Sequence, residues 1–121
     1  MNPKPSWSRG AILLLAGMAL FGLGIGAADL FNPDEPREAE MAREMLESGD
    51  LVAPRLNGEP FLEKPPLFYW LVVGAYRTAG GPSEAAARLV PAIAGLLCVL
   101  IVFAAGRRMI GGEGALVAAA V

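Results

Sequence analysis

Residues 61–70 read FLEKPPLFYW, so that an acidic and a basic side chain directly precede two prolines and an aromatic, apolar run. The uncharged stretch that begins after this charged pair covers residues 65–76 and ends at Arg77. A helix rises about 1.5 Å per residue, and the apolar core of a bilayer is about 30 Å thick. These twelve residues are too few to cross it, so they predict a re-entrant or interfacial helix at about residues 65–78.

Two longer apolar runs flank this segment. No charged residue occurs in residues 10–28 or 89–106, and each run is long enough for one membrane crossing. Hydrophobic residues make up 55% of the chain and charged residues only 18%. Apolar blocks that alternate with charged blocks are typical of membrane proteins. We therefore predict an all-α membrane protein with transmembrane helices at 10–28 and 85–106, joined by an external loop that carries short amphipathic juxtamembrane helices.

The first apolar run has two interpretations. Basic residues precede it and small residues lie near Ala28, which are also features of a cleaved signal peptide. The apolar region of a signal peptide is usually about 7–15 residues long, and this run is longer. A retained transmembrane helix is therefore the favoured interpretation.

Basic residues outside the two runs predict how the chain is oriented. They occur in the N-terminal segment 1–9 and in the segment 107–113. Because cytoplasmic segments are enriched in Lys and Arg, we expect both in the cytoplasm, the second as a turn. Residues 29–84 then form the external loop, whose eleven acidic and five basic side chains give a net charge of −6. Residues 114–121 are apolar again, and we expect the truncated start of a third transmembrane helix in a longer protein.

The acidic part of the loop predicts a second short helix at about residues 36–48. Pro36 suits a first helical turn, Asn32 or Asp34 can cap it, and Gly49 is a plausible C-terminal stop. Such a helix is too short to span a membrane, and we expect it to lie on the membrane surface or to pack on another domain. The apolar residues expected on one of its faces are Ala39, Ala42, Met45 and Leu46.

The composition gives no indication of a nucleic-acid partner. The net charge is −2, and the basic pair Arg107 and Arg108 is explained by membrane topology. Histidine is absent, which removes a common metal ligand and the usual general base. The single cysteine, Cys98, lies in an apolar run and cannot form an internal disulfide, so we expect a buried thiol that serves packing.

Two charged groups in the loop could carry chemistry. They are the acidic stretch 32–40, NPDEPREAE, and the pair Glu63 and Lys64. A carboxylate can act as a general base toward an acceptor hydroxyl, and a lysine can bind phosphate. Acids at the start of a helix also stabilise the helix dipole, and a base beside an interfacial helix is commonly a membrane anchor. The residue types alone leave both interpretations open.

Five short motifs occur in this order across residues 33–72. They are Asp-Glu-x-Arg-x-x-Glu, Arg-Glu-Met, Ser-Gly-Asp, Pro-Arg-Leu-Asn-Gly and Phe-x-Glu-Lys-Pro-Pro. This pattern resembles the first external loop of the bacterial C-type membrane glycosyltransferases, which use polyprenyl-phosphate sugars as donors. That family includes the aminoarabinose transferases of lipid A and relatives of the protein O-mannosyltransferases.

The resemblance implies roles for four residues. Asp34 corresponds to an active-site acid of the family, and Arg37, one helical turn on, would position it or pair with it. Lys64 corresponds to a lysine that contacts the phosphate of the lipid-linked donor. Glu63 corresponds to a glutamate associated with a divalent metal in some members, which makes it a weaker metal candidate.

The implied reaction is sugar transfer from a polyprenyl-phosphate donor to a lipid (such as lipid A), glycan or protein acceptor. It would take place at the external face of a bacterial plasma membrane, among membrane lipids. The 121-residue piece is expected to be inactive alone. Two other interpretations stay open: a non-catalytic membrane anchor or assembly subunit with an acidic partner-binding loop, and half of a transporter with broken helices.

Overall fold

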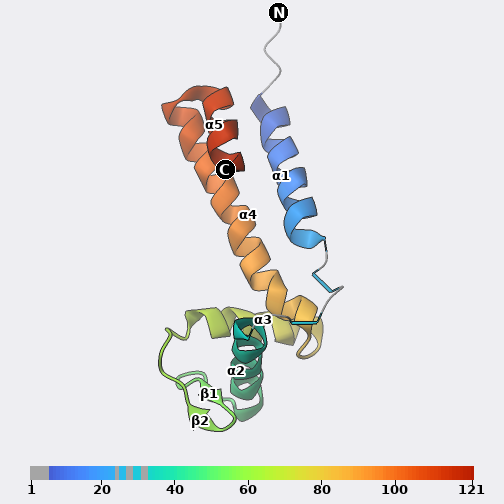
Figure 1. The fold of residues 1–121 in the computed structure, drawn as a ribbon, viewed down its shortest axis with the longest axis vertical. Coiled ribbons are helices and arrows are strands. Elements are labelled where there is room, and N and C mark those ends of the chain that lie inside the picture. The colour runs from blue at the N-terminus through green and yellow to red at the C-terminus, as the bar shows by residue number, and fades with distance from the viewer. Residues whose placement is uncertain (1–5, 24, 27–28, 31–32) are drawn as a thin grey trace, which may run out of the picture. The chain divides into compact units, whose positions relative to one another are not determined.

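The computed structural model describes residues 6–23, 25–26, 29–30 and 33–121 (Figure 1). It divides the chain into two compact units. The first unit holds Met1–Gly24 and Ala92–Val121, and the second holds Ile25–Pro91. The elements in chain order are α1 (Ser6–Gly22), α2 (Asp34–Ser48), β1 (Arg55–Leu56), β2 (Glu59–Pro60), α3 (Leu67–Ala79), α4 (Glu84–Met109) and α5 (Gly111–Ala120).

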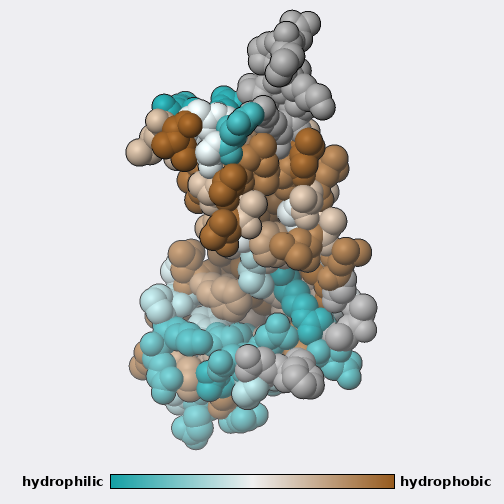
Figure 2. All heavy atoms as spheres, turned by 45° about the horizontal axis from the view of Figure 1, so that its top comes forward, coloured by the Kyte–Doolittle hydropathy of each residue, from teal (hydrophilic) through white to brown (hydrophobic). Residues whose placement is uncertain are grey.

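The first unit consists of α1, α5 and the part of α4 from Ala92 onward. Its small core contains Leu13, Phe103 and two alanines of α5. Glycines permit close packing between its helices, because a Cβ atom added to Gly95 would lie 2.9 Å from the ring of Phe21. Most other large apolar side chains of this unit are exposed, and Figure 2 shows a predominantly hydrophobic surface over it. Such a surface is what a helix bundle in contact with lipid presents.

Among the described residues, one helix is long and apolar enough to cross a membrane, and this is α4. It contains the whole segment predicted at 85–106, and Ser83 caps its start through a hydrogen bond from the Ala86 amide (3.2 Å). Cys98 is exposed on α4, so the expectation of a buried thiol is wrong for the described residues. The reason is that α4 directs much of its apolar surface outward.

The first apolar run forms a shorter helix than the sequence predicts. The expected span was 10–28, but α1 ends at Gly22, and residues 24, 27 and 28 lie outside the described residues. Glycine is a poor helix former, and the run has glycines at 22, 24 and 26. A membrane crossing by this run therefore stays a prediction.

The connection from α4 to α5 is shorter than the turn predicted at 107–113. Helix α4 continues to Met109 and α5 begins at Gly111, so Ile110 alone separates them. Gly111 has a φ of 81°, a conformation that glycine adopts without steric cost, and this allows the abrupt change of direction. The apolar segment predicted to start at residue 114 is thus already helical from Gly111. The cytoplasmic location of this connection stays a prediction.

The second unit is built on the packing of α2 against α3 (Figure 1). Helix α2 buries Met41, Ala42 and Met45 against α3. Ala39 and Leu46 are partly buried at the edge of this contact, so the predicted apolar face is present. The sequence analysis missed Met41, which is fully buried. The partners contributed by α3 are Tyr69, Val72, Val73 and Tyr76.

Proline and glycine set the ends of both helices. Helix α2 begins at Asp34, two residues earlier than predicted, and Asn32 lies outside the described residues. It ends where Gly49 adopts a φ of 74° and its amide donates to the Met45 carbonyl, as the sequence predicts. Helix α3 begins at Leu67 instead of residue 65, after a pair of prolines that have no amide hydrogen to donate.

A short β-hairpin between α2 and α3 makes the all-α prediction wrong in detail, although the described residues are mostly helical. Strands β1 and β2 pair antiparallel, with Arg55 opposite Pro60. Asn57 and Gly58 connect them with φ values of 55° and 83°, which correspond to the tight turn favoured by Asn-Gly. The Glu44 carboxylate of α2 accepts hydrogen bonds from both turn amides, at 2.5 and 3.1 Å. The hairpin is therefore fastened to α2.

Arg88, in the first turns of α4, ties together separate parts of the second unit. Its guanidinium donates to the backbone carbonyls of Ile25 (3.3 Å) and Asp29 (2.8 Å). It also forms an ion pair with Glu35 of α2, at 3.2 Å. The Arg88 side chain is only 17% exposed. One planar cation thus connects α4, the segment before α2 and the first turn of α2.

We expect Tyr76→Phe to lower the free energy of local opening of α2 and α3 by about 1 kcal/mol, because a net hydrogen bond contributes about 0.5–1.5 kcal/mol. The substitution removes the hydrogen bond from the Tyr76 hydroxyl to the Ala39 carbonyl (3.2 Å). Arg77→Lys, at an exposed position in the last turn of α3, is the control. Hydrogen–deuterium exchange of the full-length protein measures both, and equal losses would contradict this account.

We expect Arg88→Lys to accelerate hydrogen exchange in the first turn of α2 by about tenfold or more. An ammonium cannot keep a carboxylate and two carbonyls at the positions that the guanidinium reaches, and each hydrogen bond to a charged group contributes about 1.5–3 kcal/mol. Arg77→Lys, at an exposed position in the last turn of α3, is the control. Unchanged exchange in the Arg88 variant would show that this connection is dispensable.

Candidate functional site

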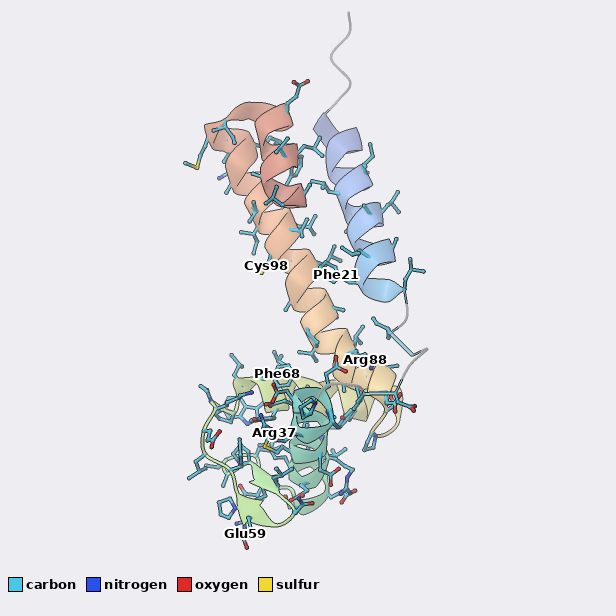
Figure 3. The ribbon with its side chains drawn as sticks, in the orientation of Figure 1. Phe21, Arg37, Glu59, Phe68, Arg88 and Cys98 are labelled. Atoms are coloured by element: carbon cyan, nitrogen blue, oxygen red, sulfur yellow. The ribbon has the colours of Figure 1, made fainter. Side chains whose placement is uncertain are left out.

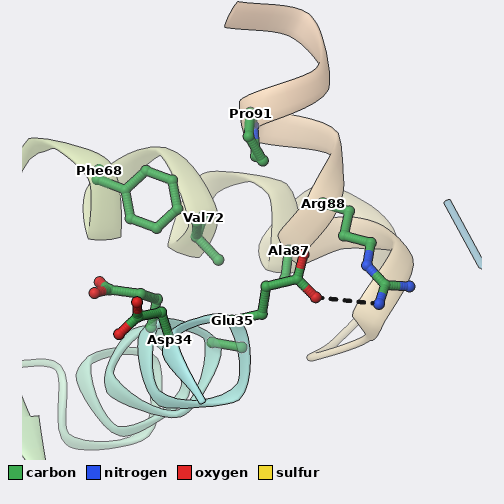
Figure 4. A pocket seen from close by; sticks show the side chains of 9 residues that line it. Asp34, Glu35, Phe68, Val72, Ala87, Arg88 and Pro91 are labelled. Atoms are coloured by element: carbon green, nitrogen blue, oxygen red, sulfur yellow. Dashed lines mark hydrogen bonds and ion pairs between the residues drawn. The ribbon is translucent and has the colours of Figure 1, made fainter. Parts of the chain in front are cut away.

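The first turns of α2 and α3 and the start of α4 enclose a cavity of about 160 Å³ in the second unit (Figure 4). Phe68 and Val72 of α3 and Pro91 of α4 give it apolar walls. Asp34 and Glu35 of α2 bring carboxylates to it, and Glu35 reaches Arg88 across the close-up view. The complete lining consists of Asp34, Glu35, Glu38, Ala39, Phe68, Val72, Ala87, Arg88 and Pro91.

A second cavity, of about 200 Å³, is lined by Glu38, Lys64, Phe68 and Tyr69. Glu38 and Phe68 line both cavities, so the two adjoin at these side chains. The first cavity is acidic and apolar, and the second adds the lysine. This combination can hold an amphipathic ligand, with an anionic group at the lysine and an apolar part against the aromatic ring.

Asp34 and Arg37 form an ion pair within the first turn of α2. The pairing has the geometry that a spacing of three residues gives on a helix. Asp34 is also favoured at this place because the N-terminal end of a helix carries a partial positive charge. Its side chain is 61% exposed and thus accessible to a ligand.

The Arg37 guanidinium has a second contact, with the aromatic ring of Phe61 at 5.5 Å from the ring centroid (Figure 3 labels Arg37). Its Nε atom is buried and makes no hydrogen bond among the described residues. A cation over an aromatic ring is attracted by the negative face of that ring. Arg37 is therefore held between α2 and the segment that leads to Lys64.

Lys64 pairs with Glu38 of α2, with 2.5 Å between Lys64 Nζ and Glu38 Oε1. The Glu38 side chain is only 13% exposed, whereas that of Lys64 is 49% exposed. The partner of Lys64 is thus Glu38, which lies one helical turn beyond Asp34 on α2. Glu38 was missed as a site residue. A spacing of four residues from Asp34 on a helix was the signal that could have identified it.

The three aromatic residues near the start of α3 do not share one environment. Tyr69 is fully buried against α2. Burial raises the pKa of Tyr69, and the neighbouring Glu38 carboxylate raises it further. Trp70 donates from its indole nitrogen to the Leu51 carbonyl (2.6 Å), and Phe68 lines the two cavities.

Glu63 does not acquire companion metal ligands in the described part of the chain. No group of three or more His, Cys, Asp or Glu side chains there has the arrangement needed to hold a metal ion. Glu63 is exposed beside Lys64 and does not line either cavity. The described residues therefore do not by themselves supply a complete set of metal ligands.

Residues 63–121 match the protein family described as dolichyl-phosphate-mannose-protein mannosyltransferase. This match begins at Glu63 and includes Lys64, α3, α4 and α5. It does not include α2, which carries Asp34 and Glu38.

Two relatives extend the similarity to most of the chain, and both are named undecaprenyl phosphate-alpha-4-amino-4-deoxy-L-arabinose arabinosyl transferase. One, from Pseudomonas savastanoi pv. phaseolicola, is 37% identical over 94 residues, which are 78% of this chain and 17% of the relative. Another, from Pseudomonas paraeruginosa, is 33% identical over 110 residues, which are 90% of this chain and 19% of the relative. The chain thus spans about a fifth of the length of these relatives, or slightly less.

The fold is also similar to a solved structure, the crystal structure of ArnT from Cupriavidus metallidurans in the apo state. The TM-score is 0.78 at 35% sequence identity, and the alignment covers 87% of this chain and 19% of that protein. In both sequence and fold, therefore, the chain belongs to the family of ArnT-like and protein-mannosyltransferase-like glycosyltransferases, of which it represents a segment.

Proposed function

We propose that the full-length protein transfers a sugar from a polyprenyl-phosphate donor to an acceptor at the external face of a bacterial plasma membrane. The names of the relatives support undecaprenyl phosphate as the lipid carrier and an amino sugar as one class of transferred group. The observation that carries the proposal is the gathering of Asp34, Arg37, Glu38 and Lys64 beside two partly apolar cavities.

Lys64 is the group that would bind the donor phosphate. Its ammonium has three N–H donors, and the pair with Glu38 uses one of them. With nearly half of the side chain exposed, a ligand can reach the remaining donors. During transfer, the bond between the anomeric carbon and the phosphate oxygen breaks, and negative charge develops on that oxygen. The Lys64 ammonium at this place would stabilise the developing charge.

Asp34 is the group that would activate the acceptor. A bond forms between the acceptor oxygen and the anomeric carbon, and the hydroxyl proton passes to the Asp34 carboxylate as to a general base. Arg37 fixes the direction of this carboxylate through their ion pair. Because Arg37 also contacts Phe61, the orientation of Asp34 is coupled to the segment that carries Lys64.

The apolar walls would hold the first part of the lipid. Phe68, Val72 and Pro91 line the cavity beside the carboxylates. A cavity of about 160 Å³ admits only a small part of a polyprenyl chain, so the remainder would lie in the bilayer. This placement needs the phosphate at the membrane surface, which is where an exposed lysine next to an interfacial helix can meet it.

We expect Asp34→Asn and Lys64→Ala each to abolish sugar transfer by the full-length protein, while membrane insertion persists. The first substitution removes the base and the second removes the charge that stabilises the leaving phosphate. Transfer is measured with radiolabelled or fluorescent donor in proteoliposomes. Glu47→Gln, which removes an exposed acid elsewhere on α2, is the control and should retain activity. Near-normal transfer by either site variant would refute the role given to that residue.

We also expect the residues of the hairpin to face the outside of the cell. The test introduces Glu59→Cys into a background in which Cys98 and any other cysteine of the full-length protein are replaced by serine, because Glu59 is exposed in β2 (Figure 3). A membrane-impermeant maleimide should label this variant in intact spheroplasts. Labelling that requires lysis would place residues 29–84 in the cytoplasm and contradict the proposed orientation.

A further inference from the structure

The acid that neutralises Lys64 lies at the place where the proposed function requires a phosphate. Glu38 Oε1 is 2.5 Å from Lys64 Nζ, and both residues line the same cavity of about 200 Å³. A phosphate bound to the ammonium would therefore come close to this carboxylate. Two anions that share one cation repel each other, so ligand and Glu38 compete for Lys64.

Glu38 is held where it can compete. The Glu38 side chain is only 13% exposed, whereas the Lys64 side chain is 49% exposed. The fully buried Tyr69 lines the same cavity beside Glu38. The acid is thus the more buried partner of the pair, and the lysine is the more exposed one.

We propose that Glu38 is an internal competitor of the lipid phosphate, which weakens the retention of the polyprenyl-phosphate product. This inference rests on the proposed function, in which Lys64 binds the phosphate. With an empty site, Glu38 neutralises the ammonium. With a ligand bound, the Lys64 ammonium interacts with both Glu38 and the phosphate. When the product dissociates, the ion pair between Glu38 and Lys64 forms again.

The chemistry of the reaction makes this competition selective. The donor is a phosphodiester with one negative charge, whereas the product is a phosphomonoester, which carries a charge of about −1.5 to −2 at pH 7. Transfer therefore increases the negative charge next to Glu38. The repulsion between carboxylate and phosphate is correspondingly larger for the product than for the donor. Glu38 thereby favours release of the product over loss of the donor.

The test uses the full-length protein in nanodiscs, with undecaprenyl phosphate as the probe and undecaprenol as the uncharged control ligand. We expect Glu38→Gln to bind undecaprenyl phosphate about tenfold more tightly than the wild type, because the like-charge repulsion is removed. Binding of undecaprenol should not change. In turnover assays, kcat should fall because product release slows, KM for the donor should fall, and product inhibition should strengthen.

Control variants separate charge from packing. Glu38→Asp keeps the charge and should retain the weak wild-type affinity, and Glu47→Gln removes a charge from α2 away from Lys64 and should have no effect. If Glu38→Gln does not fold, Glu38→Ala tests the same expected direction. Unchanged or weaker binding of undecaprenyl phosphate by the neutral variants would overturn the competition, since a merely structural clamp behaves in that way.

Lys64→Ala distinguishes failure of this inference from failure of the proposed function. If Lys64→Ala weakens binding of undecaprenyl phosphate and Glu38→Gln does not tighten it, the phosphate site stands and the competitor role falls. If Lys64→Ala leaves the affinity for undecaprenyl phosphate unchanged, Lys64 is not the phosphate site, and both proposals fall.

Discussion

The contact between α2 and α3 is the interaction on which the candidate site depends. Met41, Ala42 and Met45 pack against aromatic and β-branched residues of α3 with almost no exposed surface. Burial of a methionine side chain contributes about 1.5–3 kcal/mol, so Met41 and Met45 are a substantial part of what holds α2 against α3. The same contact fixes the position of Asp34 and Glu38 on α2 relative to Phe68 and Tyr69 on α3.

Charge pairing is the second constraint, because the site combines many charges with apolar walls. Each charged group described at the N-terminal end of α2 has an opposite charge nearby, such as Arg37 for Asp34 and Lys64 for Glu38. Exposed ion pairs contribute little to stability, so their value here is in orientation. In the Glu38–Lys64 pair the acid is mostly buried and the base is exposed. An anionic ligand can therefore reach the lysine and take the place of the carboxylate, as the proposed phosphate binding requires.

Local sequence signals predicted helices near the positions of α2, α3 and α4, whereas contacts between distant residues could not be read from them. Gly49 and the proline pair indicated where α2 ends and where α3 begins, and the pairing of Asp34 with Arg37 was implied by the family resemblance. The Lys64–Glu38 pair joins residues 26 positions apart. Its formation depends on how the hairpin returns the chain to α2, and periodicity within one segment carries no information about that path. The burial of Tyr69 was missed for the same reason, since its apolar neighbours come from α2.

The central claim is that the side chains at the start of α2 and α3 form the binding site of a lipid-linked phosphate. The most direct measurement is a cryo-EM map of the full-length protein in nanodiscs with bound undecaprenyl phosphate. The account predicts phosphate density in hydrogen-bond contact with Lys64, with the Glu38–Lys64 pair lengthened or broken. Phosphate density elsewhere, with this pair intact, would contradict it.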